Sequence, residues 1–132
     1  MLAKVALATI LIFCAQADSA ACAELPVRPA ILLQFESDQQ VRDLAKNGPA
    51  VIFFYAKWCP NCKAAALAFS ARWDEVRPGV ALIVADYDKQ TALKTRYGVT
   101  YQDTYVLVGP DGEKRKIWNG GGITALNANT AN

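Results

Sequence analysis

The chain has 132 residues, enough for one domain. Its 14 lysines and arginines nearly balance 12 aspartates and glutamates, which gives a net charge of +2. No basic patch and no acidic tract stands out, so the composition disfavours a nucleic-acid-binding protein and a solvating acidic tail.

The first 23 residues have the pattern of a signal peptide. Lys4 supplies the positive charge at the start, and the apolar stretch Val5–Ala15 that follows is too short to span a bilayer. Small residues come next, with Ala21-Cys22-Ala23 as one cleavage site and Ala15-Gln16-Ala17 as a second. We therefore expect an exported protein, periplasmic or extracellular, with no membrane span after cleavage.

Two other fates of this segment stay open, an uncleaved anchor and lipid modification of Cys22. Lipid anchoring is disfavoured because Ser19-Ala20-Ala21 lacks the usual aliphatic residue three positions before the cysteine. Cleavage after Ala23 also removes Cys14, so the mature chain keeps two of the four cysteines. A secreted chain with one close cysteine pair has no disulfide framework, which indicates a chemical role for the pair.

Residues 24–30 form a polar linker, and residues 31–132 are expected to form the domain. The linker holds two prolines and leads into a short strand, Ile31–Phe35. Ser37 and Gln40 then form a capping box, which predicts the start of a helix.

The stretch after this helix has the strongest pattern in the chain. Ala50–Ala56 is almost continuously apolar, which predicts a central strand covered on both faces. Lys57-Trp58 lead from it into Cys59-Pro60-Asn61-Cys62 and an alanine-rich helix expected to reach Pro78-Gly79. One face of that helix must lie on the sheet, because apolar residues recur at steps of four and three: Cys62, Ala66, Phe69, Trp73 and Val76.

The helix pattern distinguishes the two cysteines. Cys59 lies at the helix start, where unpaired N–H groups and the helix dipole favour a thiolate, so we expect it to be the more acidic and more accessible thiol. Cys62 lies on the packed face and should be covered. Pro60 suits the first helical turn, where a missing N–H costs nothing. We predict Cys59 as nucleophile and Cys62 as resolving thiol.

The remaining elements continue the alternation of strands and helices, which predicts an α/β sandwich with a mixed sheet. The weak tail after the last strand is expected to be a short helix or frayed. The elements are a strand at Val80–Ala85, a helix capped by Asp88 that ends at Tyr97-Gly98, strands at Thr104–Val108 and Glu113–Trp118, and the tail from Asn119.

Other roles for the cysteine pair are a structural disulfide and half of a metal site. A bridge between cysteines three positions apart closes a tiny loop and removes little entropy from the unfolded chain. A zinc site would need carboxylates such as Asp103, because the chain has no histidine. A cluster shared by two chains is also conceivable. We predict no bound metal and no organic cofactor.

Phe53 to Lys63 resembles the thioredoxin superfamily through the pattern F-x-A-x-W-C-x-x-C-K. The resemblance extends from about Ile31 to about Gly122. It implies a thioredoxin-like sandwich, with a mixed sheet flanked by helices, and thiol–disulfide exchange with protein substrates and a redox partner protein, in a direction that it leaves open. It also implies that Trp58 and Pro60 contact the substrate. We expect a monomer. The alternatives are a redox-inactive adaptor and a metal or cluster carrier.

The chain departs from the family pattern at two positions. Phe53 stands where the family has a buried acid, six residues before Cys59, so Cys62 needs another proton acceptor. Asp103 stands where the family has a cis-proline, and we expect a trans Gln102–Asp103 bond. Gln102 and Asp103 would then contact the substrate. The Asp103 carboxylate would either disfavour a nearby thiolate or take over proton transfer, unless it is a solvated loop residue.

Overall fold

The sheet is built around β2 (Ala50–Tyr55), whose first five residues are buried. β2 pairs in parallel with β3 (Ala81–Asp86) on one side and antiparallel with β4 (Thr104–Val108) on the other. β1 (Ile31–Gln34) extends the parallel side, and β5 (Lys114–Asn119) extends the antiparallel side. The resulting order, β1-β3-β2-β4-β5, confirms the predicted mixed sheet with β2 at its centre.

The computed structural model describes residues 26–132. The predicted signal peptide, Cys22 and the first residues of the linker lie outside this range. Residues 26–30 have no regular secondary structure, as expected for a linker. No helix within residues 26–132 is long and apolar enough to cross a membrane.

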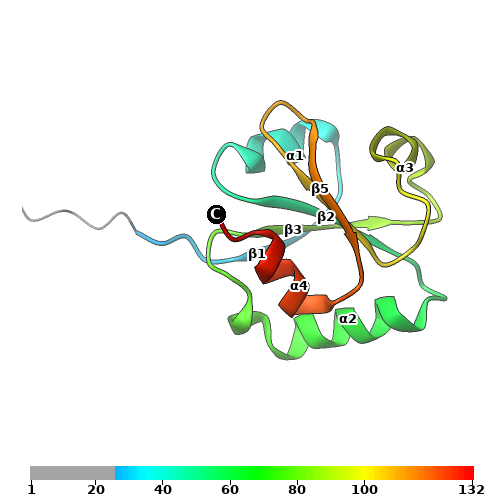
Figure 1. Ribbon diagram of the computed structural model, residues 1–132, viewed down its shortest axis with the longest axis horizontal. Coiled ribbons are helices and arrows are strands. Elements are labelled where there is room, and N and C mark those ends of the chain that lie inside the picture. Colours follow the sequence, from blue (N-terminus) through cyan, green and yellow to red (C-terminus); the bar gives the residue numbers. More distant parts are fainter. Residues whose placement is uncertain (1–25) are drawn as a thin grey trace, which may run out of the picture.

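Helices cover both faces of the sheet, which confirms the α/β sandwich (Figure 1). α1 (Asp38–Ala45) and α3 (Thr91–Tyr97) lie on one face, and α2 (Pro60–Ala71) and α4 (Gly122–Asn129) lie on the other. Alternate side chains of β2 therefore enter two separate cores, because successive strand residues point to opposite faces. Phe53 belongs to the α2 and α4 core, together with both cysteines.

The helix ends follow from local chemistry. Ser37 Oγ accepts the Gln40 N–H at 3.1 Å, so the predicted cap of α1 is present. Gly98, at φ +69°, adopts the left-handed conformation that ends α3, which a side chain would disfavour. α4 is a regular helix of eight residues, so the tail is the short helix rather than the frayed segment.

α2 is shorter than predicted. The sequence pattern carried it to Pro78, whereas α2 ends at Ala71 and a single 3₁₀ turn follows. Distant contacts explain the break, because the Trp73 indole N–H donates to the carbonyl of Ala30 at 3.2 Å, in the segment just before β1. Asn127 of α4 donates to the carbonyl of Glu75 at 2.8 Å. These contacts draw the chain after Ala71 toward the two elements beside it.

The predicted cap of α3 is also wrong. α3 begins at Thr91, and Asp88 lies outside it, with no side-chain cap at its start. The Asp88 carboxylate instead accepts the indole N–H of Trp58, at 3.1 and 3.2 Å. Asp88 therefore supports the segment that carries the cysteines, a contact over thirty residues of sequence that no local pattern reveals.

Candidate functional site

Cys59 occupies the junction between β2 and α2. It is the N-cap residue of α2, and its sulfur accepts the backbone N–H of Cys62 at 3.1 Å. Pro60 is the first helical residue, as predicted. The Cys59 sulfur thus faces the unpaired N–H groups and the positive end of the α2 dipole, which stabilise a thiolate.

The predicted difference in accessibility between the two thiols is small in the reduced structure. Both thiols are free, and Cys59 is only 2% exposed against 0% for Cys62. The sulfur of Cys59 turns inward because it caps the helix, so its own hydrogen bond draws it away from solvent. The two cysteines therefore differ in environment rather than in exposure.

Cys62 is buried in the core beneath α2. It lies in the same cluster as Phe69 of the helix and Tyr105 of β4. Burial is the main cause that raises the pKa of the Cys62 thiol from 9.0 to about 12, and the neighbouring Cys59 and Asp103 act in the same direction. A reduced Cys62 is therefore protonated at neutral pH.

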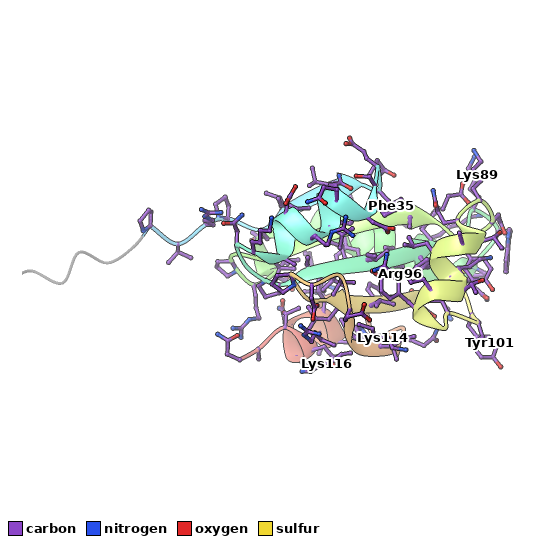
Figure 2. The ribbon with its side chains drawn as sticks, turned by 90° about the horizontal axis from the view of Figure 1, so that it is seen from above. Phe35, Lys89, Arg96, Tyr101, Lys114 and Lys116 are labelled. Atoms are coloured by element: carbon purple, nitrogen blue, oxygen red, sulfur yellow. The ribbon has the colours of Figure 1, made fainter. Side chains whose placement is uncertain are left out.

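Trp58, directly before Cys59, and Tyr101 are exposed aromatic side chains. Trp58 is 56% exposed although its indole N–H is bonded to Asp88, and its ring meets Tyr87 edge to face with centroids 6.3 Å apart. Tyr101, in the loop before β4, is also exposed and projects away from the body of the domain (Figure 2). Trp58 thus presents a fixed, exposed aromatic surface directly before Cys59, and its contact with a substrate stays a prediction. Pro60 is exposed beside it.

Hydrogen bonds to neighbouring segments on both sides hold the loop that contains Gln102 and Asp103. Asp103 N–H donates to the carbonyl of Phe54 at 3.0 Å, and the Asp103 carbonyl accepts the N–H of Gly120 at 2.8 Å. The carbonyl of Gln102 accepts the Asn119 side chain at 2.8 Å. The Gln102–Asp103 bond is trans, as expected, and Asp103 has φ +58°.

Asp103 is buried, so the alternative of a solvated loop residue is wrong. The residue is 6% exposed, and burial raises the pKa of its carboxyl above the usual 3.8. It lines a cavity of about 430 Å³ between the loop and α2. The other lining residues are Asn61, Ala64, Ala65 and Ala68 of α2 and the segment Asn119–Gly122.

Phe53, at the position of the family's buried acid, is enclosed by other rings. It stacks on Tyr105 of β4 with centroids 4.5 Å apart and planes 5° apart, and Phe69 meets it edge to face at 6.0 Å. Phe53 is 1% exposed. This side of the site therefore has an aromatic group where proton transfer would need an ionisable one.

The sequence did not single out Tyr105. Its hydroxyl, the Oδ1 atom of Asp103 and the Nε1 atom of Trp118 are buried and lack a hydrogen-bond partner in the described part of the chain. Burial raises the pKa of Tyr105, and the Asp103 carboxylate and Cys62 raise it further. The Tyr105 hydroxyl and the Asp103 carboxylate are thus close enough to interact, although they fall short of hydrogen-bond geometry. No sequence pattern brings the two side chains together, because Asp103 precedes β4 and its positive φ interrupts the alternation of strand residues.

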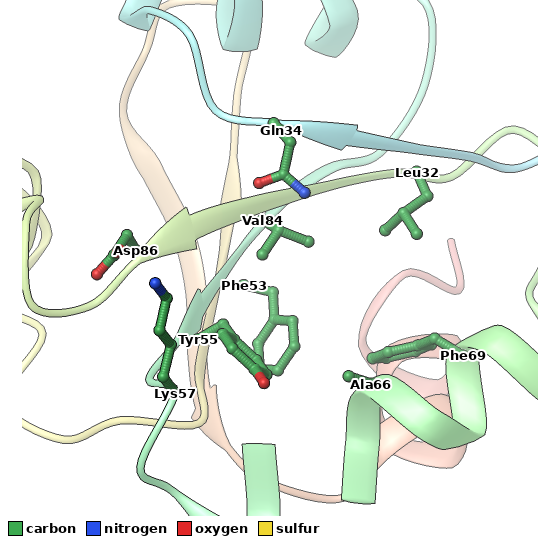
Figure 3. Close-up of a pocket in the computed structure, with 9 residues that line it drawn as sticks. All are labelled: Leu32, Gln34, Phe53, Tyr55, Lys57, Ala66, Phe69, Val84 and Asp86. Atoms are coloured by element: carbon green, nitrogen blue, oxygen red, sulfur yellow. The ribbon is translucent and has the colours of Figure 1, made fainter. Parts of the chain in front are cut away.

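A second cavity, of about 380 Å³, opens on the same face of the sheet near the β1 edge (Figure 3). Its floor is apolar, and Lys57 and Asp86 lie on one side of it, with the Lys57 side chain extending toward Asp86. Phe53, which belongs to the same core as both cysteines, forms part of the wall of this cavity. The remaining lining residues are Leu32, Gln34, Tyr55, Ala66, Phe69 and Val84.

The described residues offer no obvious metal site. Within residues 26–132, no three cysteine, aspartate, glutamate or histidine side chains gather in an arrangement that could hold an ion. Cys59, Cys62 and Asp103 interact electrostatically, but they form no such group. The chemistry that this arrangement offers is that of two thiols and a buried carboxyl.

Comparison with known proteins gives a consistent result. The family model described as Thioredoxin matches residues 30–130. The thioredoxin of Mycoplasma pneumoniae is 31% identical over 87 residues, which cover 65% of this chain and 84% of that protein.

Solved structures resemble the fold over most of its length. The crystal structure of Trxlp from Edwardsiella tarda has a TM-score of 0.61 at 20% identity, and the match covers 77% of this chain and all of that one (100%). The thioredoxin of Malassezia sympodialis has a TM-score of 0.61 at 25% identity, covering 75% of this chain and 89% of that one. At 20% identity the first likeness concerns the fold alone.

Proposed function

Because the chain belongs to the thioredoxin family, we propose that it is an exported thiol–disulfide oxidoreductase that exchanges disulfides with protein thiols. One observation carries the proposal. Cys59 Sγ caps α2 and accepts the Cys62 N–H at 3.1 Å, while the thiol of Cys62 lies in the core behind it. The pair thus combines a sulfur at a helix terminus with a protonated partner close enough to attack it.

The reaction follows from these two environments. The Cys59 thiolate attacks one sulfur of a substrate disulfide, the substrate S–S bond breaks, and the released sulfur leaves as a thiolate that takes up a proton. Cys59 is then joined to the substrate in a mixed disulfide. Cys62 loses its proton and attacks the Cys59 sulfur, which frees the second substrate thiol and leaves a Cys59–Cys62 disulfide. Two electrons pass to the substrate, and the reverse sequence oxidises a dithiol.

The residues around Cys59 provide the surface for contact with the substrate. Trp58 offers an exposed apolar surface held by Asp88, and Pro60 lies at the start of α2. Gln102 belongs to the neighbouring loop, which hydrogen bonds hold in place. We propose that a polypeptide substrate lies across Trp58, Pro60 and this loop, and that a separate redox protein restores the dithiol.

The test is a trap for the mixed disulfide. Cys62→Ser is expected to accumulate disulfide-linked substrates in the compartment to which the chain is exported, because it attacks through Cys59 but does not resolve. Cys59→Ser is the matched control and should trap nothing. Non-reducing gels followed by mass spectrometry identify the linked proteins.

Other outcomes would replace the proposal. Trapping by Cys59→Ser instead of Cys62→Ser would reverse the two roles. If neither variant trapped a protein and the wild-type chain did not reduce a disulfide, a redox-inactive adaptor would be the better description. Metal that protects the reduced thiols from alkylation would favour a metal or cluster carrier.

A further inference from the structure

Cys62 must transfer its thiol proton to an acceptor before it can attack in the resolving step. Cys62 is 0% exposed and protonated at neutral pH, and it must become a thiolate before it attacks. Phe53, packed between Tyr105 and Phe69, offers no acceptor. Water from bulk solvent reaches a fully buried sulfur poorly, so the acceptor is best sought among the side chains beside it.

Asp103 is the carboxylate that acts electrostatically on Cys62. It is 6% exposed and lines a cavity with Asn61 and Ala65 of α2, the helix that carries Cys62. The groups that act on the Cys62 thiol are few: the Ala56 backbone, which favours the thiolate, and Cys59 and Asp103, which disfavour it. Tyr105 also interacts with both cysteines and with Asp103. Among them, Asp103 alone is a carboxylate.

The backbone holds this carboxylate in an unusual position. Asp103 has φ +58°, the one positive φ outside glycine within residues 26–132, and this conformation is uncommon for a residue with a side chain. Hydrogen bonds to Phe54 and Gly120 fix it from both sides. Aspartate tolerates this conformation better than most residues, and the two hydrogen bonds keep its side chain in one place.

The Asp103 carboxylate can also accept a further hydrogen. Its Oδ1 atom is buried and unpartnered among the described residues, as is the hydroxyl of Tyr105 beside it. Buried polar atoms are nearly always hydrogen-bonded, so each exception calls for an explanation. The Tyr105 hydroxyl interacts with this carboxylate without reaching hydrogen-bond geometry, so Oδ1 can still accept a proton.

We propose that Asp103 is the proton acceptor for Cys62 in the resolving step, a role that rests on the proposed function. The Cys62 S–H bond breaks as its proton passes to the Asp103 carboxylate, and the thiolate attacks the Cys59 sulfur. The bond between Cys59 and the substrate sulfur breaks, and the substrate leaves with the electron pair. Asp103 then returns its proton to the departing thiolate or to solvent.

Charge supports this assignment. Ionising Cys62 beside a charged Asp103 would bury two like charges, which is unfavourable. Moving the proton from Cys62 to Asp103 leaves one negative charge in the site before and after the transfer. Burial raises the pKa of the Asp103 carboxyl, which makes it a better base for a thiol than a solvated carboxylate.

The test separates attack from resolution. Reduced protein is mixed with dithiobis-nitrobenzoate, and the absorbance of the released thionitrobenzoate is followed by stopped flow. The first release reports attack by Cys59 and depends on reagent concentration. The second release reports resolution by Cys62, and its rate does not depend on reagent concentration.

Two substitutions remove the carboxylate and tolerate a positive φ: Asp103→Asn and Asp103→Gly. Both are expected to slow the second release by roughly 10²-fold, the usual contribution of a positioned base, while the first release slows less than about twofold. In both variants the rate of the second release should rise about tenfold per pH unit, because hydroxide replaces the missing base. In the wild type this rate should level off as pH rises. Asp74→Asn, the same change at an exposed site on the 3₁₀ turn, should match the wild type.

The possible failures are distinguishable. If the second release keeps the wild-type rate and pH profile in both variants, Asp103 is not the acceptor, and the proposed function stands. If the wild-type protein shows no first release, the proposed function fails instead. A first release that keeps its wild-type rate in the variants shows that their site is folded.

Discussion

The burial of Cys62 predicts that the reduced protein loses stability in alkaline solution. The pKa of this thiol is 9.0 in an ordinary environment and about 12 in the fold. At neutral pH the thiol is protonated in both the folded and the unfolded chain, so it contributes nothing to the pH dependence there. As pH rises past the ordinary value, the unfolded chain releases the proton while the folded chain keeps it, so the free energy of unfolding falls.

The magnitude follows from the same two values. At about pH 10 most unfolded molecules have ionised the thiol and almost no folded molecules have, which costs the folded state roughly 1 kcal/mol. Cys62→Ser has no thiol to ionise at this position. The difference in stability between wild type and Cys62→Ser should therefore shift by this amount, against the wild type, between neutral pH and that pH.

The assay is urea unfolding of both proteins under a thiol-free reductant, followed by far-ultraviolet circular dichroism at several pH values. Tyrosines and other groups titrate in both proteins and cancel in the difference. Ser70→Ala, exposed on α2, controls for substitution in the same helix and should keep the wild-type slope. Parallel curves for wild type and Cys62→Ser across this pH range would show that Cys62 is not held protonated by the fold.

Three further outcomes are expected. Tyr105→Phe removes an unpartnered buried hydroxyl and should be neutral or stabilise the protein by about 1 kcal/mol, whereas Tyr97→Phe removes a buried 3.0 Å hydrogen bond and should cost about 1 kcal/mol, both measured by urea unfolding. Phe53→Ala should destabilise by roughly 3–5 kcal/mol, and a loss below about 2 kcal/mol would mean that the neighbouring cavity lets the site collapse. Mass spectrometry of the exported protein should find a chain that begins near Glu24, and a lipid on Cys22 would instead indicate a membrane-anchored form.

The parts of the fold that could be predicted are those determined by local pattern. The apolar run Ala50–Ala56 allowed only a strand covered on both faces, and β2 is the central strand. The start and stop signals of two helices were equally local: Ser37 caps α1 and Gly98 ends α3. The strand bounds differ from the predicted ones by about one residue, within the usual uncertainty of element ends.

The failures share a physical cause, namely contacts between distant parts of the chain. α2 ends at Ala71 because Trp73 bonds to Ala30, and Asp88 supports Trp58 instead of capping α3. Periodicity along one helix carries no information about either contact. The end of a helix that tertiary contacts determine is therefore beyond a sequence pattern.

The candidate site shows the same division. The motif placed Cys59 and Cys62 at the start of α2, and the structure has them there, while their roles as nucleophile and resolving thiol stay predictions. The burial of Cys59 was missed because it depends on the direction of one sulfur. The sequence left open whether Asp103 is solvated, and hydrogen bonds to Phe54 and Gly120 hold it where it is buried.

The outer strand β5 has a consequence for how this molecule meets other chains. It forms one margin of the sheet, and its first three side chains, Lys114, Arg115 and Lys116, are all exposed cations (Figure 2 labels both lysines). A second copy that tried to extend the sheet across this margin would bring like charges together, a device that guards proteins against edge-to-edge aggregation. The opposite margin, β1, is protected differently, since its four residues offer little length for pairing. A protein proposed to handle other polypeptides can thus approach them without recruiting them into its own sheet.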